Sequence, residues 1–219
     1  MSHKNSTYSP SQKTLRLFPK KFISRSKSLL NPLSHLLIKS KISPNSLSIL
    51  ALIIGLGAGI LFFFGKPFWA GIFIVICGTL DILDGKVAEE AHKKSLYGAH
   101  LDSSLDRYSE FFIYLGIAYY FKDHWAVWII FWTILGSFMV SYTRAKAESL
   151  GIECKIGFIQ RGERIVALSA AAVIGPLLKV FDTFMIVVLI SIAVVSNITA
   201  IQRILYVRKS EKLIKKEAE

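Results

Sequence analysis

Residues 46–65 read SLSILALIIGLGAGILFFFG, a run without a single charged side chain. A helix that crosses the hydrocarbon core of a bilayer needs roughly 20 mostly apolar residues, and this run meets that length. The rest of the chain has the same character, because 53% of its 219 residues are hydrophobic and its mean hydropathy is +0.47. An ordinary soluble domain is less apolar than this. The sequence therefore predicts an integral membrane protein.

Further apolar segments follow the first one. Together they lie at about residues 46–65, 68–85, 99–121, 125–143, 165–181 and 184–207. We interpret them as six transmembrane helices in one all-α bundle. The two long connections, 86–97 and 144–164, are rich in Lys and Arg, and such connections stay on the cytoplasmic side. We therefore expect a multi-pass protein of the cell membrane, with both termini and both long loops in the cytoplasm.

The segments outside the six helices are polar and basic. Residues 1–30 lack a sustained apolar period, which predicts a flexible N-terminal tail without a cleavable signal peptide. Asn31 is a candidate cap, with Pro32 at the first position, for a short amphipathic helix on the membrane surface. An irregular basic linker is the alternative. Residues 31–207 would then form one membrane domain, followed by a charged C-terminal tail at 208–219.

The charge distribution narrows the range of partners. The formal net charge is +12, and Lys and Arg gather in the tails and in the two long loops. A nucleic-acid-binding face would interleave them with aromatic residues, so we expect no nucleic acid. Membrane lipids and ligands that carry phosphate explain the basic excess better. Cys77 lies in an apolar run and Cys154 in a polar one, so we expect no disulfide.

Four aspartates stand where the second and third apolar segments meet. Asp81 and Asp84 are three residues apart and Asp102 and Asp106 are four apart, so each pair shares one face of its helix. Antiparallel packing of the two helices would bring all four carboxylates together near the cytoplasmic interface. Their mutual repulsion requires a cation. Oxygen ligands without His or Cys favour magnesium, manganese or calcium over zinc.

Each aspartate taken singly has a simpler explanation, because an aspartate near a helix end is usually solvated or a helix cap. The set is different, since Gly85, Ala88 and Gly98 stand beside the carboxylates and would let two helix ends approach a ligand closely. Intramembrane carboxylates also occur in cation transporters, which we keep as an alternative. These carboxylates, however, gather at one interface instead of tracing a path across the bilayer.

Residues 81–107, DILDGKVAEEAHKKSLYGAHLDSSLDR, resemble the signature of the CDP-alcohol phosphatidyltransferases, D-x2-D-G-x2-A-R-x8-G-x3-D-x3-D. Every spacing matches, and one residue type departs, because Glu89 stands where the family has Arg. The family transfers a phosphatidyl group from a CDP-activated lipid to an alcohol and releases CMP. The resemblance implies a membrane enzyme, commonly a homodimer. It further implies two divalent ions, magnesium or alternatively manganese, held by Asp81, Asp84, Asp102 and Asp106, with Asp106 also acting as the general base.

The resemblance also implies where the CDP-lipid binds. The segment ISPNSLSI at 42–49 resembles the donor-binding stretch of the family, and the signature supplies the other contacts. The expected donor-binding residues are Pro44, Asn45, Ser46, Leu47, Gly85, Ala88, Glu89, Ser95 and Gly98. The family's Arg helps to hold the diphosphate, so Glu89 raises the alternative of a weakly active homologue. Lys86, Lys93 or Lys94 would then have to supply the missing charge.

The segments SYTRAKAESLG at 141–151 and GFIQRGERIV at 157–166 resemble the phosphatidylinositol phosphate synthase branch of this family. In that branch three basic residues bind the phosphate of a phosphorylated polyol, and they correspond here to Arg144, Arg164 and Arg203. Lys146 and Arg161 lie close enough in sequence to be confused with them. Anchoring to lipid headgroups is the simpler role for arginines at helix ends. The expected acceptor is inositol phosphate, and glycerol 3-phosphate is the alternative.

Overall fold

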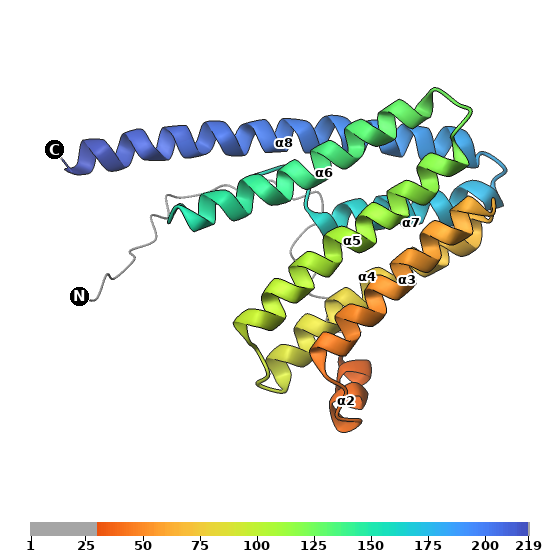
Figure 1. The fold of residues 1–219 in the computed structure, drawn as a ribbon, viewed down its shortest axis with the longest axis horizontal. Coiled ribbons are helices and arrows are strands. Elements are labelled where there is room, and N and C mark those ends of the chain that lie inside the picture. The colour runs from red at the N-terminus through yellow and green to blue at the C-terminus, as the bar shows by residue number, and fades with distance from the viewer. Residues whose placement is uncertain (1–29, 219) are drawn as a thin grey trace.

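The computed structural model describes residues 30–218, and the regular elements of that range are seven α-helices (Figure 1). Their bounds are α2 Asn31–Lys39, α3 Pro44–Phe63, α4 Pro67–Glu90, α5 Leu96–Tyr120, α6 Ala126–Ser149, α7 Arg161–Leu177 and α8 Phe181–Ala218. The tail expected at 1–30 lies, apart from its last residue, outside the described range. Each of the last six helices overlaps one of the six predicted apolar segments, and α8 extends well beyond its segment.

Side chains at the helix starts explain several of these boundaries. The Ser43 hydroxyl accepts a hydrogen bond from the Ser46 N–H at 3.1 Å and caps α3. Ser95 caps α5 in the same way, through the Gly98 N–H at 2.9 Å. At α7, Gln160 and Glu163 form a reciprocal capping box. Ser43 follows α2, and the other two caps end the connections from α4 to α5 and from α6 to α7, so each of these three helices begins at a defined residue.

Helix α3 holds the first half of the molecule together. It packs along both α4 and α5, which touch each other much less. Helices α6 and α8 form a second pair, and α7 lies against α4 and α8 and so joins the two parts (Figure 1). The shared core contains Ile74, Ile113, Ile117, Leu168 and Leu189, all fully buried. The sequence predicted that α4 and α5 pack directly against each other. In the structure both instead pack against α3, which lies between them.

Two glycines allow α3 and α5 to approach closely. Gly59 and Gly116 face each other, and a Cβ atom built on either one collides with backbone of the other helix. Because backbone cannot turn aside as a side chain can, Gly116→Val is expected to lower the free energy of unfolding by about 1–3 kcal/mol. Thermal unfolding in detergent measures the loss. The control is Leu115→Val, at the neighbouring half-exposed position, which is expected to leave the melting temperature unchanged. A Gly116→Val protein as stable as the wild type would contradict the close approach of α3 and α5.

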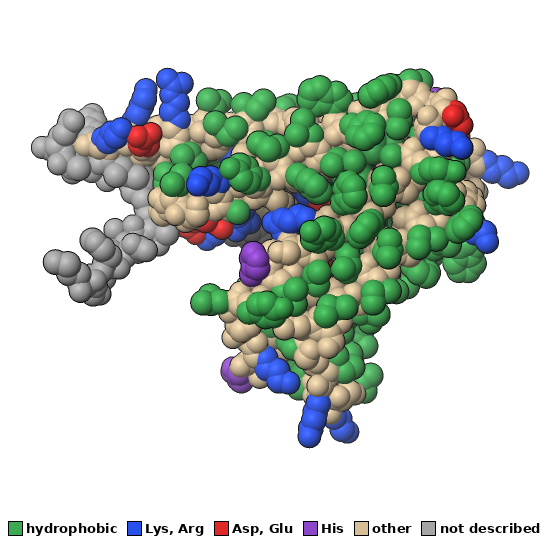
Figure 2. Space-filling view, in the orientation of Figure 1, with side chains coloured by type: hydrophobic (Ala, Val, Ile, Leu, Met, Phe, Trp, Pro, Cys, Tyr) green, Lys and Arg blue, Asp and Glu red, His purple; other side chains and the backbone are tan. Residues whose placement is uncertain are grey.

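Among the described residues, four helical stretches are long and apolar enough to cross a membrane. They are α3, α4, α6 and residues Phe181–Leu213 of α8. Helix α5 carries Asp102, Asp106, Arg107 and Glu110, and α7 has 17 residues and begins with charged ones. On the face drawn in Figure 2, hydrophobic side chains cover the middle of the helices and most Lys and Arg side chains lie toward the ends. The protein is thus an all-helical membrane bundle.

The two ends of the described chain are also helical. Helix α2 begins at Asn31, so Asn31 is the first helical residue and not the cap that the sequence suggested. Ser34 of α2 donates a hydrogen bond to Glu90 of α4 at 2.9 Å, and Lys86 of α4 donates one to the Asn31 side chain. At the other end α8 has 38 residues, a length of roughly 57 Å. The charged tail expected at 208–219 therefore continues this helix to Ala218.

Candidate active site

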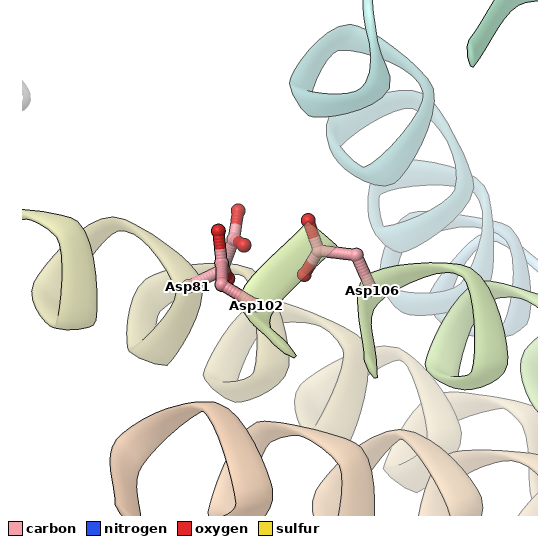
Figure 3. A group of neighbouring side chains, drawn as sticks. All are labelled: Asp81, Asp102 and Asp106. Carbon is pink, nitrogen blue, oxygen red and sulfur yellow. The ribbon is translucent and has the colours of Figure 1, made fainter. Parts of the chain in front are cut away.

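The structure brings the carboxylates of α4 and α5 together, although these helices barely touch. Asp81 of α4 and Asp102 and Asp106 of α5 each place an oxygen within 4.8 Å of the others (Figure 3). Asp84 lies one turn further along α4, 3% exposed, and accepts a hydrogen bond from the Ser48 hydroxyl of α3 at 2.5 Å. Helix α3 therefore sets the distance between the two carboxylate pairs, and it also supplies a hydrogen-bond donor to one of them.

The cluster suits a divalent cation. Its donors are carboxylate oxygens, which magnesium and manganese accept. The Asp102 Oδ1 atom is buried and has no hydrogen-bond partner among the described residues. A buried carboxylate oxygen without a donor is costly unless something positive reaches it. The residues present thus fit the metal that the family resemblance implies.

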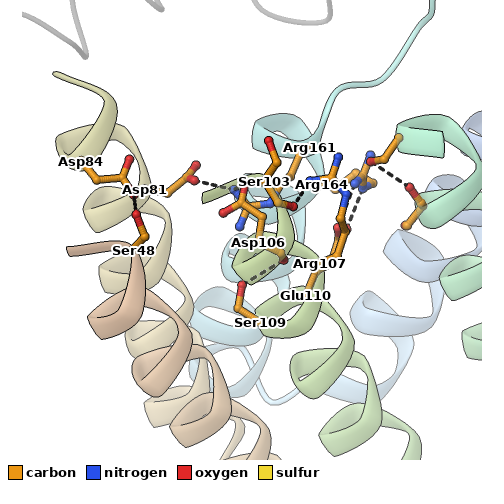
Figure 4. Close-up of polar contacts among 12 residues, drawn as sticks. Ser48, Asp81, Asp84, Ser103, Asp106, Arg107, Ser109, Glu110, Arg161 and Arg164 are labelled. Carbon is orange, nitrogen blue, oxygen red and sulfur yellow. Dashed lines mark hydrogen bonds and ion pairs between the residues drawn. The ribbon is translucent and has the colours of Figure 1, made fainter. Parts of the chain in front are cut away.

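Arg161 also contacts this cluster, and the sequence had named it only as a neighbour of the candidate phosphate ligands. Its Nη1 atom lies 2.7 Å from Asp81 and 2.9 Å from Asp106 (Figure 4). The residue stands at the first position of α7, directly after the Gln160 cap. The spacing of Arg161 and Arg164 was a usable signal, because residues three apart on a helix share a face.

Arg161→Gln is expected to make the stability of the protein more dependent on magnesium. Arg161 pairs with the same two carboxylates, Asp81 and Asp106, that would hold a metal ion, so its removal leaves repelling carboxylates that a metal would have to neutralise. The rise in melting temperature on adding magnesium should exceed that of the wild type by about 4 °C, or roughly 1–2 kcal/mol. Lys155→Gln, which removes an exposed cation from the α6–α7 connection, is the control. Equal rises in the two variants would contradict the competition.

A cavity of about 240 Å³ opens beside the cluster. Asp84 and Asp102 belong to its wall, and its mouth lies between the starts of α3 and α5 and the end of α4. Six of the nine expected donor-binding residues line it: Pro44, Asn45, Gly85, Ala88, Ser95 and Gly98. Ser48, Lys93, Lys94 and Ala99 also line it, and of these Ser48 and Ala99 were not expected.

The other three expected donor residues face elsewhere. Leu47 is buried, the Ser46 hydroxyl pairs with that of Ser43, and Glu89 forms an ion pair with Lys94 at 3.1 Å. Lys86 is engaged by Asn31 and by Glu90 at 3.6 Å. Of the three lysines considered for the missing family Arg, Lys93 and Lys94 therefore stand at the cavity and Lys86 does not.

Glycine has different uses at the two ends of this cavity. A Cβ atom at Gly98 would lie 2.9 Å from the Ser95 hydroxyl oxygen and 3.2 Å from Asn45 Oδ1, so the absence of a side chain permits that close packing. At Gly85 a Cβ atom would meet no described atom within 4 Å. The space next to Gly85 is open, which agrees with a glycine that leaves room for a ligand.

The three arginines expected to bind a phosphate lie on α6, α7 and α8, and they differ in burial and in their hydrogen-bond partners. Arg164 is fully buried and pairs with Glu110, at 2.7 Å from Nε and 2.9 Å from Nη2. Arg203 is 3% exposed and donates to backbone carbonyls, that of Ile156 at 2.9 Å and that of Val140. Arg144 is more exposed and pairs with Glu148 at 2.8 Å.

These charges are close enough to act on one another. Both Arg144 and Arg164 repel the charge of Arg203, whose hydrogen bonds reach neutral carbonyl groups. The connection from 150 to 160 packs against α8, where the Phe158 N–H donates a hydrogen bond to the Thr199 hydroxyl at 3.2 Å. Burial also raises the pKa of the Cys154 thiol in this connection, so the thiol stays protonated at neutral pH. Of the three arginines, Arg144 and Arg164 are paired with glutamates, whereas Arg203 is held by backbone carbonyls.

Comparisons with known proteins identify the family of this chain. The family model described as CDP-alcohol phosphatidyltransferase matches residues 41–208. An archaetidylinositol phosphate synthase of Pyrococcus horikoshii is 38% identical over 77% of this chain and 85% of that protein. A phosphatidylinositol phosphate synthase of Streptomyces avermitilis is 31% identical over 83% of this chain and 78% of that protein.

Solved structures lead to the same group of proteins. A crystal structure of the Mycobacterium tuberculosis phosphatidylinositol phosphate synthase with CDP-DAG bound has a TM-score of 0.73 at 27% identity, covering 80% of this chain and 92% of that one. The same enzyme in complex with manganese and citrate has a TM-score of 0.74, covering 80% and 87%.

Proposed function

We propose that this chain, which belongs to the CDP-alcohol phosphatidyltransferase family, transfers the lipid-linked phosphoryl group of a CDP-activated lipid to inositol phosphate and releases CMP. The observation that carries the proposal is the position of the carboxylate cluster. It stands between a cavity lined by donor-type residues and the arginines Arg161 and Arg164 of α7. A donor with a diphosphate and an acceptor with a phosphate would meet at the cluster.

The reaction is a displacement at the lipid-linked phosphorus. The acceptor hydroxyl oxygen forms the new bond to phosphorus, the bond from phosphorus to the CMP oxygen breaks, and the hydroxyl proton passes to Asp106. Magnesium or manganese, when bound by Asp81, Asp84, Asp102 and Asp106, would neutralise the diphosphate and the departing CMP. Arg161 orients Asp106 through its ion pair, and Ser48 orients Asp84.

On the donor side, Asn45 and Ser95 present polar groups to the nucleotide, and Lys93 and Lys94 supply positive charge for the diphosphate. Glu89 offsets part of that charge through its pair with Lys94. Glu89→Arg is therefore expected to lower the KM for the CDP-lipid several-fold, measured by CMP release. Asp123→Arg, the same charge change at the turn after α5, is the control. An unchanged KM would show that Lys93 and Lys94 already replace the family Arg fully.

On the acceptor side, guanidinium groups suit a phosphate because they donate paired hydrogen bonds and remain charged when partly desolvated. The test is CMP release by purified protein with a CDP-lipid and each acceptor in turn. Turnover with inositol phosphate supports the proposal. Turnover with glycerol 3-phosphate alone would replace it with phosphatidylglycerophosphate synthesis.

We further propose that α5 and α7 cross the membrane with the four apolar helices, which gives six spans. The Lys and Arg residues of the connection 91–95, of the segment 144–164 and of the end of α8 support a cytoplasmic position for the active site and both termini. Labelling of single cysteines with an impermeant reagent in oriented vesicles tests this orientation. The family resemblance also leads us to propose a homodimer, which cross-linking in membranes tests. It further leads us to propose two bound metal ions, which metal titration tests.

A further inference from the structure

A buried polar network crosses the bundle beside the carboxylate cluster. Arg164 of α7 binds Glu110 of α5 through two hydrogen bonds, at 2.7 and 2.9 Å. The Tyr114 hydroxyl donates to Glu110 at 3.4 Å and lies 3.2 Å from the Ser137 hydroxyl of α6. All four side chains are at most 1% exposed. Three helices thus contribute to one chain of contacts within the apolar core.

One nitrogen of the Arg164 guanidinium group, Nη1, takes no part in this network. Glu110 takes hydrogen bonds from Nε and Nη2, whereas Nη1 is buried without a hydrogen-bond partner among the described residues. Buried donors are nearly always paired in folded proteins. A donor of this kind on a charged group therefore points to a ligand that supplies the missing acceptor.

Two parallel ion pairs connect α5 and α7. Arg161 pairs with Asp106, and Arg164, three residues later, pairs with Glu110, four residues after Asp106 (Figure 4). The charges of Arg161 and Glu110 also act on each other, so the two pairs are neighbours. Arg164 has Glu110 as its ion-pair partner, and Arg161 has Asp81 and Asp106. Each arginine of α7 is thus held by a different set of carboxylates.

We propose that Glu110 is a positioning residue: it fixes the Arg164 guanidinium through Nε and Nη2 and leaves Nη1 for the phosphate of the acceptor. This inference rests on the proposed function, in which Arg164 binds the acceptor. Tyr114 and Ser137 support Glu110 in turn. The role is distinct from that of the aspartates, because Glu110 contacts neither the metal nor the reacting atoms.

Glu110→Gln tests the proposal through the separate KM values of the two substrates. We expect the KM for inositol phosphate to rise about 10-fold or more, the range typical of residues that orient a binding group, and the KM for the CDP-lipid to change less than about twofold. Glu110→Asp, which keeps the charge, should recover part of the loss. In an Arg164→Lys background, Glu110→Gln should add little, because the two residues act as a unit.

A structural control separates positioning from general destabilisation. Thr133 is fully buried and donates to the Leu189 carbonyl of α8 at 3.2 Å, away from the carboxylate cluster. Thr133→Val should lower the melting temperature without changing the KM for inositol phosphate. If Glu110→Gln raises both KM values equally, or lowers only the melting temperature as Thr133→Val does, the proposal is overturned.

A binding measurement distinguishes failure of this inference from failure of the proposed reaction. Inositol phosphate should raise the melting temperature of the wild type and have little effect on Glu110→Gln. If inositol phosphate protects the wild type but not Glu110→Gln, and the wild type releases no CMP, the proposed reaction is overturned and the role of Glu110 is retained. Equal protection of both proteins, or none of the wild type, would overturn the role of Glu110.

Discussion

Asp106→Asn is expected to reduce CMP release by about 1,000-fold or more. The substitution removes the group that accepts the hydroxyl proton, a contribution of roughly 100- to 10,000-fold in enzymes generally, and it removes a charged metal ligand as well. Purified protein with saturating CDP-lipid and acceptor measures the effect as kcat. The fold should survive, because the amide oxygen that Asp106→Asn introduces can still accept a hydrogen bond from Arg161.

The control for this substitution is Asp123→Asn, which removes a carboxylate from the exposed turn between α5 and α6. It lies at the opposite end of the bundle from the cluster and should leave kcat unchanged. An Asp106→Asn protein that keeps more than about a tenth of the wild-type kcat would exclude Asp106 as the general base.

Removal of divalent ions is expected to abolish CMP release completely and reversibly. Asp81, Asp102 and Asp106 lie within 4.8 Å of one another, and a diphosphate brought next to them would add further negative charge. Without a metal the donor and the cluster repel each other, so both donor binding and catalysis should fail. A chelator titration followed by CMP release measures the loss.

Added magnesium or manganese should restore the activity, and the chelator already saturated with magnesium should have no effect. This second condition shows that the loss comes from metal removal and not from the chelator itself. Full activity in excess chelator would contradict the metal site and leave the four aspartates without a catalytic explanation.

Much of this arrangement could be predicted from the sequence, because it depends on local spacing. The first apolar run, 46–65, differs from α3 at Pro44–Phe63 by two residues at each end. The pairs Asp81 with Asp84 and Asp102 with Asp106 lie on faces that the helical period defines. Three of these four carboxylates, those of Asp81, Asp102 and Asp106, lie together in the structure, and Asp84 stands one turn away. Six of the nine donor-binding residues expected from the family resemblance line one cavity.

What the sequence did not predict depends on which distant residues meet. Nothing local indicates that α3 separates α4 from α5, or that Ser48 would bind Asp84. The role of Arg161 was missed because an arginine at a loop end is usually an anchor to lipid headgroups. Glu110 carried no recognised motif, and its buried pair with Arg164 requires two helices to meet at one depth.

The spacing of polar residues along α5 has a consequence for the whole bundle. Asp102, Asp106, Glu110 and Tyr114 follow one another every four residues, so they form one stripe that winds slowly around the helix. Turning α5 by a single residue position would rotate this stripe by roughly 100° and separate Asp106 and Glu110 from Arg161 and Arg164, their ion-pair partners on α7. These ion pairs therefore fix the rotation of α5 about its own axis, together with the shape of its contact with α3.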